Sequence, residues 1–109
     1  MSKNRNERSG MFDIEYGLAS ASLTAGKTIV TTTGADYHGI SIIAGAALCT
    51  VTLYDNASAT TGNIIDIFVV KTTSDVWIDR YIPVKAKNGL TINVSGAGAK
   101  GAVFFGPKG

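Results

Sequence analysis

Residues 48–70 read LCTVTLYDNASATTGNIIDIFVV, two strand-like apolar runs on either side of a polar loop. Residues 49–54 alternate apolar and polar side chains, which is the period-two pattern of a half-buried strand. Residues 55–63 then supply the Asp, Asn, Ser, Thr and Gly residues that favour turns, before the second apolar run begins at Ile64. The stretch therefore predicts a β-hairpin, and we expect its polar loop to project from one end of the domain.

The rest of the chain repeats this pattern of short apolar runs separated by turn residues. Six further strands are predicted, at residues 12–16, 28–33, 37–44, 76–84, 90–94 and 102–105, while residues 17–22 are too small and mixed to assign. Strands at this spacing, without a helical pattern, are typical of a sandwich or small barrel. We predict an all-β fold, a single antiparallel β-sandwich of about eight strands that is jelly-roll-like or Greek-key. The strand order stays open, and with it an immunoglobulin-like alternative.

Two local signals refine this prediction. Residues 76–84 alternate strictly, which places Ile78, Ile82 and Val84 on one face, and Trp77 and Asp79 on the other. Pro83 lacks a backbone N–H, so this strand is expected to lie at a sheet edge or to end near the proline. Asn88-Gly89 is the clearest tight-turn signal in the chain.

The charge distribution divides the chain into an arm at residues 1–10 and a β-sandwich domain at residues 11–109. The arm carries Lys3, Arg5 and Arg8 against Glu7, a net charge of +2, and we expect it to be flexible. Of the 10 basic and 8 acidic residues, seven of each remain in the domain, which is therefore neutral. A nucleic-acid-binding domain usually shows a basic stripe, so no nucleic-acid partner is expected.

The sequence also bears on compartment and membrane association. One cysteine excludes an intrachain disulfide and suits a reducing compartment. The N-terminal residues lack the apolar segment of a secretory signal, and no run approaches the roughly 18 apolar residues that span a bilayer. We expect synthesis in the cytoplasm and no membrane partner.

Catalysis is not expected. His38 is the only histidine, and no nucleophile motif surrounds the serines near it in the sequence, so it is interpreted as a surface or strand-edge residue. Cys49 shares the alternate face of Val51 and Leu53, which predicts a buried cysteine. One Cys and one His do not complete a zinc site without carboxylates.

Oxygen-rich residues of the 55–63 loop could suggest calcium. Their spacing departs from that of an EF-hand loop and no bidentate Glu follows, so a turn held by Asn, Asp, Ser and Thr side chains explains them with fewer assumptions. We predict no cofactor and no metal.

Two groups of residues are candidates for partner binding. Trp77 and Tyr81 flank Asp79 on one strand face, an arrangement that suits either a sugar platform or a protein interface, and we favour the interface. Two of the carboxylates Glu15, Asp66 and Asp79 could also form a glycosidase-like pair, but an outward polar face or an interface explains them as well, and we favour the interface. The basic residues Lys3, Arg5 and Arg8 could instead order on an acidic surface of a neighbouring subunit.

Three motifs in residues 39–105 resemble small structural proteins of tailed bacteriophages. They are Leu53-Tyr54-Asp55 with Ser58-Ala59, then Asn88-Gly89-Leu90, then Val94-Ser95-Gly96 continuing to Val103. The motifs consist of residues that form turns and begin strands, and they contain no catalytic or ligand-binding pattern.

The resemblance implies a non-enzymatic virion structural protein. A head-fibre base and a tail-associated β-sandwich fit this implication, but above all we expect a capsid decoration (cement) protein. Such a protein sits on the capsid exterior, binds the outer shell and bridges neighbouring major capsid proteins. The expected partners are the major capsid protein and further copies of the chain, as a dimer or trimer. The alternative is a carbohydrate-binding β-sandwich module of a phage tail or fibre.

Overall fold

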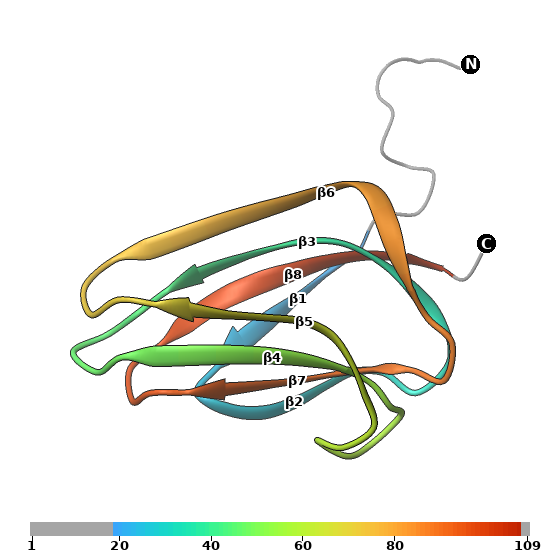
Figure 1. Ribbon diagram of the computed structural model, residues 1–109, viewed down its shortest axis with the longest axis horizontal. Helices are drawn as coiled ribbons and strands as arrows, with labels where there is room; N and C mark the ends of the chain where they lie inside the picture. Colours follow the sequence, from blue (N-terminus) through green and yellow to red (C-terminus); the bar gives the residue numbers. More distant parts are fainter. Residues whose placement is uncertain (1–18, 108–109) are drawn as a thin grey trace, which may run out of the picture.

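The computed structural model describes residues 19–107, which form eight strands and no helix. The strands are β1 (Ala19–Thr24), β2 (Gly26–Thr31), β3 (Ala35–Ile43), β4 (Cys49–Asp55), β5 (Asn63–Val70), β6 (Asp75–Ala86), β7 (Leu90–Ser95) and β8 (Lys100–Pro107). They make two four-stranded antiparallel sheets, ordered β1-β8-β3-β6 and β2-β7-β4-β5 (Figure 1). The predicted all-β class is confirmed.

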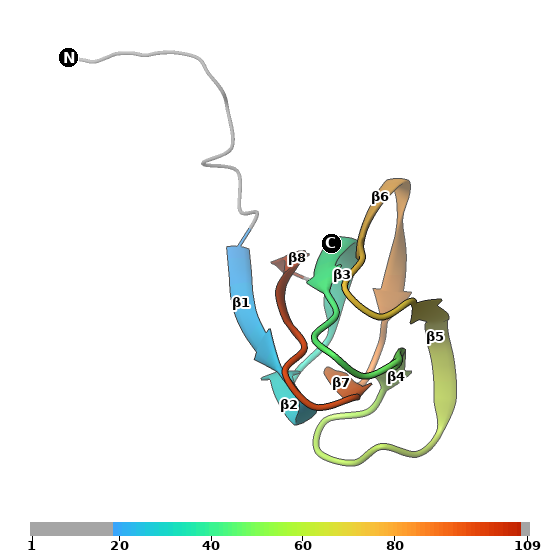
Figure 2. The ribbon, with the colours of Figure 1, turned by 90° about the vertical axis from the view of Figure 1, so that its left-hand side faces the viewer.

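The two sheets lie face to face as two layers (Figure 2). The predicted β4–β5 hairpin is confirmed, with Cys49 opposite Val70 at one end and Asp55 opposite Asn63 at the other. Around this hairpin, β3 pairs with β6, β2 with β7, and β1 with β8. The chain is thus paired as one long antiparallel hairpin, with its two halves shared between the two layers.

Side chains from both sheets fill the space between the layers. The largest fully buried ones are Tyr37, Leu23, Ile40, Ile42, Leu53, Leu90, Ile92, Val51, Val70, Val94 and Val103. Thr91 is also fully buried, but it lies on the outer side of its sheet beneath the β4–β5 loop, where its Oγ1 donates to the carbonyl of Asn56. Cys49 belongs to the same core and is fully buried, as predicted, and its burial raises the pKa of the thiol. Apolar burial of this kind contributes about 25 cal/mol per Å², so the alternating inward positions supply the main stabilisation of the sandwich.

The first strand of the fold lies where the sequence was ambiguous. β1 is built mostly from Ala and Ser, and Leu23 is its one large buried side chain, so its apolar signal is weak. It becomes a strand because β8 offers a continuous pairing partner, from Ala19 opposite Phe105 to Thr24 opposite Lys100. The strand predicted at residues 12–16 and the arm at residues 1–10 lie outside the described residues.

The Asn88-Gly89 turn is confirmed, but it joins strands of different sheets. It connects β6 in one layer to β7 in the other, so it is not a hairpin turn. Gly89 has a φ of 151°, and a Cβ there would lie 2.7 Å from the Cα of Ala57. Glycine therefore fits both the backbone conformation and the close approach of the neighbouring loop.

The loop between β4 and β5 is held by Asn56, as the turn interpretation predicted. Its Oδ1 accepts hydrogen bonds from the N–H groups of Ser58 and Ala59, and its Nδ2 donates to the carbonyl of Thr61. The expectation that this loop projects freely is wrong. Lys27 Nζ donates to the carbonyl of Ser58 and Thr91 Oγ1 to that of Asn56, because β2 and β7 offer side-chain donors to the loop carbonyls.

A wide bulge interrupts β6, so the strict alternation predicted for residues 76–84 is wrong beyond Arg80. Tyr37 of β3 lies opposite Val84, whereas Gly39 lies opposite Asp79, so four residues of β6 face the single residue between them. Inward and outward positions alternate as predicted from Val76 to Arg80, but Ile82 is 78% exposed instead of facing the core. β6 is an edge strand, as its Pro83 predicted, and a bulge there is tolerated because no further strand pairs with it.

Candidate functional site

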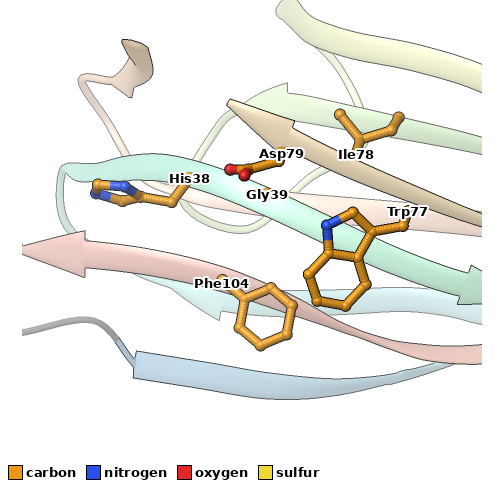
Figure 3. Close-up of a pocket in the computed structure, with 6 residues that line it drawn as sticks. All are labelled: His38, Gly39, Trp77, Ile78, Asp79 and Phe104. Carbon is orange, nitrogen blue, oxygen red and sulfur yellow. The ribbon is translucent and has the colours of Figure 1, made fainter. Parts of the chain in front are cut away.

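The outer face of the β1-β8-β3-β6 sheet carries an open hollow of about 210 Å³, which we call the trough. Its lining residues come from three strands and are His38, Gly39, Trp77, Ile78, Asp79 and Phe104 (Figure 3). The pairing register explains why these residues meet: Gly39 on β3 lies opposite Asp79 on one side and Phe104 on the other.

The floor of the trough is the backbone of β3, whose outward positions here are small. Ser41 lies opposite Trp77 of β6 and Ala102 of β8, so no large side chain fills the space above it. A Cβ at Gly39 would lie only 2.6 Å from the carbonyl oxygen of Ile78. A backbone atom cannot move aside as a flexible side chain can, so the depth of the trough depends on glycine at this position.

Two aromatic rings form its wall. Trp77 is 69% exposed, and its ring centroid lies 5.7 Å from that of Phe104, with the planes inclined by 41°. The separation is typical of interacting aromatic pairs, and the inclination is intermediate between stacked and edge-to-face packing. An exposed tryptophan steadied in this way presents a rigid apolar surface to a partner.

The polar groups of the trough are an imidazole and a carboxylate. Among residues 19–107, no side-chain hydrogen bond or ion pair is found for His38 or Asp79. Figure 3 shows His38 on strand β3 and Asp79 beside it. Their hydrogen-bonding capacity is therefore available to a ligand or partner.

A second polar cluster seals the seam between the two sheets. Arg80 Nη2 lies 2.5 Å from Asp66 Oδ2, and the Tyr37 hydroxyl donates to the same oxygen at 3.3 Å. Burial, and then the negative charge of Asp66, raises the pKa of Tyr37 well above its ordinary value, while the hydrogen bond to Asp66 raises that of Arg80. The cluster joins β3, β5 and β6 through this ion pair and this hydrogen bond, while the buried Arg80 Nε has no hydrogen-bond partner among residues 19–107. We interpret it as a structural tie.

The structure separates the carboxylates considered as a catalytic pair. Asp66 is committed to the seam, whereas Asp79 lies on the outer face, and Glu15 lies outside the described residues. His38 and Cys49 are likewise apart, since one lines the trough and the other is buried between the sheets. Among residues 19–107, no group of three or more His, Cys, Asp or Glu side chains could hold a metal ion. Within that range, no helix is long and apolar enough to cross a membrane.

The residues predicted to bind a partner are only partly brought together. Trp77 lies in the trough beside Asp79, and Tyr81 lies further along β6, in the bulge. Lys3, Arg5 and Arg8 lie outside the described residues. Phe104 was not predicted; the only signal for it was its outward position in the alternation with the buried Val103.

No family model matches this chain, and no significant match was found among curated proteins or solved structures.

Proposed function

We propose that this chain is a non-enzymatic virion structural protein, a capsid decoration protein that binds the outer shell and bridges neighbouring major capsid proteins. The observation that carries the proposal is the strand pairing, β1 with β8, β2 with β7, β3 with β6 and β4 with β5. This pairing supports a jelly-roll-like topology, and jelly rolls recur in viral capsid and lectin domains. The resemblance of residues 39–105 to phage structural proteins favours the virion among these.

The trough supports the proposal because it offers a partner an exposed aromatic anchoring surface. Interfaces are enriched in aromatic residues at their centre, and Trp77 is exposed with a second ring behind it. Binding to an assembled shell stabilises that shell by mass action, since the interface exists only after assembly. Such a role needs no reaction.

Co-sedimentation with capsids assembled from the major capsid protein of the same genome tests the proposal. Wild-type protein should pellet with the capsids and raise their melting temperature, and Trp77→Ala should weaken binding at least tenfold, as expected for an interface anchor. Leu48→Ala is a matched control, because Leu48 is 56% exposed but does not line the trough. Wild-type protein that stays in the supernatant at every concentration would refute the proposal.

The basic arm is part of the same proposal. We expect Lys3, Arg5 and Arg8 to reach across a subunit boundary to an acidic surface of the shell, an electrostatic contact that salt screens. Deleting residues 1–10 should weaken capsid binding and leave the circular dichroism spectrum unchanged. Unchanged affinity for capsids would show that the arm does not take part.

The alternative, a carbohydrate-binding module, draws on the same trough. An exposed tryptophan can stack on the apolar face of a sugar ring, and Asp79 and His38 could then accept or donate hydrogen bonds to hydroxyls. A glycan array with wild type and Trp77→Ala separates the two functions. A wild-type signal that Trp77→Ala abolishes would favour the glycan, whereas an array without signal would remove this alternative.

A further inference from the structure

The outer face of the β2-β7-β4-β5 sheet differs from the trough side and has no assigned role. We call it the threonine face. It consists of the outward strand residues Lys27, Ile29, Thr50, Thr52, Tyr54, Ile64, Ile67, Val69, Asn93 and Ser95, as the alternation and the pairing register define them. Thr91 is on the same side but is buried beneath the β4–β5 loop. β-branched residues dominate this set, and they pack well on a pleated surface.

The threonine face exposes an apolar stripe. Ile64, Ile67 and Val69 lie along β5 and are 53%, 57% and 54% exposed. The adjacent outward residues of β4 are Thr50, Thr52 and Tyr54, which carry no charge. Three large β-branched aliphatic residues on one exposed strand are unusual for a surface that only water covers.

Charge decides what could cover this face. Among the strand residues listed above, Lys27 alone is charged, and it lies on β2, at the edge opposite the apolar stripe. In a two-fold interface, a residue meets its own copy only at the axis and meets another residue of the same face elsewhere. A face with almost no charge can therefore pack on its copy without bringing like charges together. The threonine face meets that condition, whereas the trough side carries Asp75 and Asp79 on one strand.

Edge-to-edge pairing of β5 with a second β5 is a different way to associate, and the structure disfavours it. The Ile67 N–H donates to Asp66 Oδ1 at 3.0 Å, so a side chain already occupies this backbone donor. Asp66 is held in place by Arg80 of β6. A side chain that occupies an edge donor in this way hinders pairing of β5 with another strand at this position.

We propose that the threonine face is a self-association surface, covered in solution by the same face of a second copy of this chain. The two sheets would pack about 10 Å apart, with the β5 stripe of each copy against the threonine-rich strands of the other. The inference does not rest on the proposed function, because it concerns the purified protein alone.

The size of the face sets the expected affinity. Four strands about 4.8 Å apart and six residues long, at about 3.3 Å per residue, cover about 400 Å² per copy. The two copies together would bury about 800 Å², below the range of stable specific interfaces. We therefore expect a weak dimer, with a dissociation constant of tens of micromolar or more, on the order of 50 µM.

Sedimentation velocity from about 5 to about 500 µM, a range that brackets such a constant, tests the proposal. The wild type should shift from monomer to dimer. Ile67→Lys should weaken association at least tenfold, because it would bury an unpaired charge in the interface between the two copies. Ile43→Lys is the matched control: Ile43 is 52% exposed on the opposite sheet, so its substitution should change association less than about twofold.

The single tryptophan reports independently on which face is covered. Trp77 lies on the other sheet, so its fluorescence emission should stay constant as the dimer forms. Val69→Lys repeats the test at a second position of the stripe if Ile67→Lys lowers the melting temperature. A wild type that stays monomeric, equal effects of Ile67→Lys and Ile43→Lys, or a Trp77 emission that shifts on association would each overturn the proposal.

Discussion

The two outer faces of this sandwich are built by the same folding pattern and look nothing alike. Both consist of the outward positions of four antiparallel strands over one shared core. The trough side combines small floor residues, two aromatic rings and charged groups, whereas the threonine face is rich in β-branched residues and almost uncharged. Because outward side chains contribute little to the core, their composition responds to what touches them more than to the fold.

The difference also has a structural cause at one residue. On the trough side, Gly39 lets β3 and β6 approach closely at the start of the bulge. The sheet of the threonine face also has register shifts, but they form no comparable hollow among the described residues. The following predictions test how far each face depends on such features, beginning with the largest expected effect.

Gly39→Ala should be the most damaging of these changes, at about 3 kcal/mol, because the added Cβ would force the backbone of Ile78 to move. The shift should also disturb Trp77, on the same strand as Ile78, and change its fluorescence emission. Chemical denaturation measures the first effect and the emission spectrum the second. Ser41→Ala, two residues along β3, is the control and should change stability by less than about 0.5 kcal/mol. Equal stability of the two variants would show that the close approach at Gly39 is not needed.

Arg80→Met should cost about 2 kcal/mol, because it leaves Asp66 and Tyr37 at the seam without their cation. Arg80 is partly exposed, at 39%, so water compensates for some of the loss, and the estimate lies below that for a fully buried pair. Thermal and urea unfolding measure the cost. Lys85→Met provides a comparison, since the exposed Lys85 lies 3.7 Å from Asp36 in a looser pair, and it should cost less than about 1 kcal/mol. If both substitutions cost the same, the seam is not a special tie between the sheets.

Alkaline pH should weaken the same seam. The folded-state pKa of Tyr37 is raised above its unfolded value of about 10, so the neutral phenol stabilises the fold fully below pH 10. Above that pH the unfolded chain loses its proton first, and stability should fall by about 1.4 kcal/mol per pH unit from this group. Unfolding free energies measured between pH 8 and about 11.5 should show this slope in wild type and not in Tyr37→Phe. Parallel curves for the two proteins would contradict the assignment.

The strand content was predictable because period-two alternation is strong wherever one face is buried. The segments around Cys49–Asp55 and Ile64–Val70 show it clearly, and their pairing followed from the loop between them. β1 was missed because alanine and serine carry no hydrophobic contrast, and its strand conformation depends on β8, about eighty residues later in the chain. The sheet change at Asn88-Gly89 was also hidden, since the same dipeptide suits a hairpin turn and a connection between layers.

The candidate site was only half visible in the sequence. Trp77 and Asp79 share a strand, so their common face could be derived from spacing alone. Phe104 joins them only through the order β8-β3-β6, which local sequence does not specify. The bulge in β6 was not predicted either. Four residues of β6 opposite one residue of β3 can be recognised only when the partner strand is known.

The smallest expected effects compare the two faces directly. Trp77→Ala and Ile67→Ala should each cost no more than about 1 kcal/mol of stability, since both side chains are more than half exposed and only Trp77 loses a ring partner. Val51 is fully buried between the sheets, so Val51→Ala should cost about 2–3 kcal/mol of stability and provides the reference for a core position. Urea unfolding at a low protein concentration, where monomer dominates, measures all three. A large loss of stability for either exposed residue would mean that its face contributes to folding. The composition of that face could then no longer be attributed to contact with a partner.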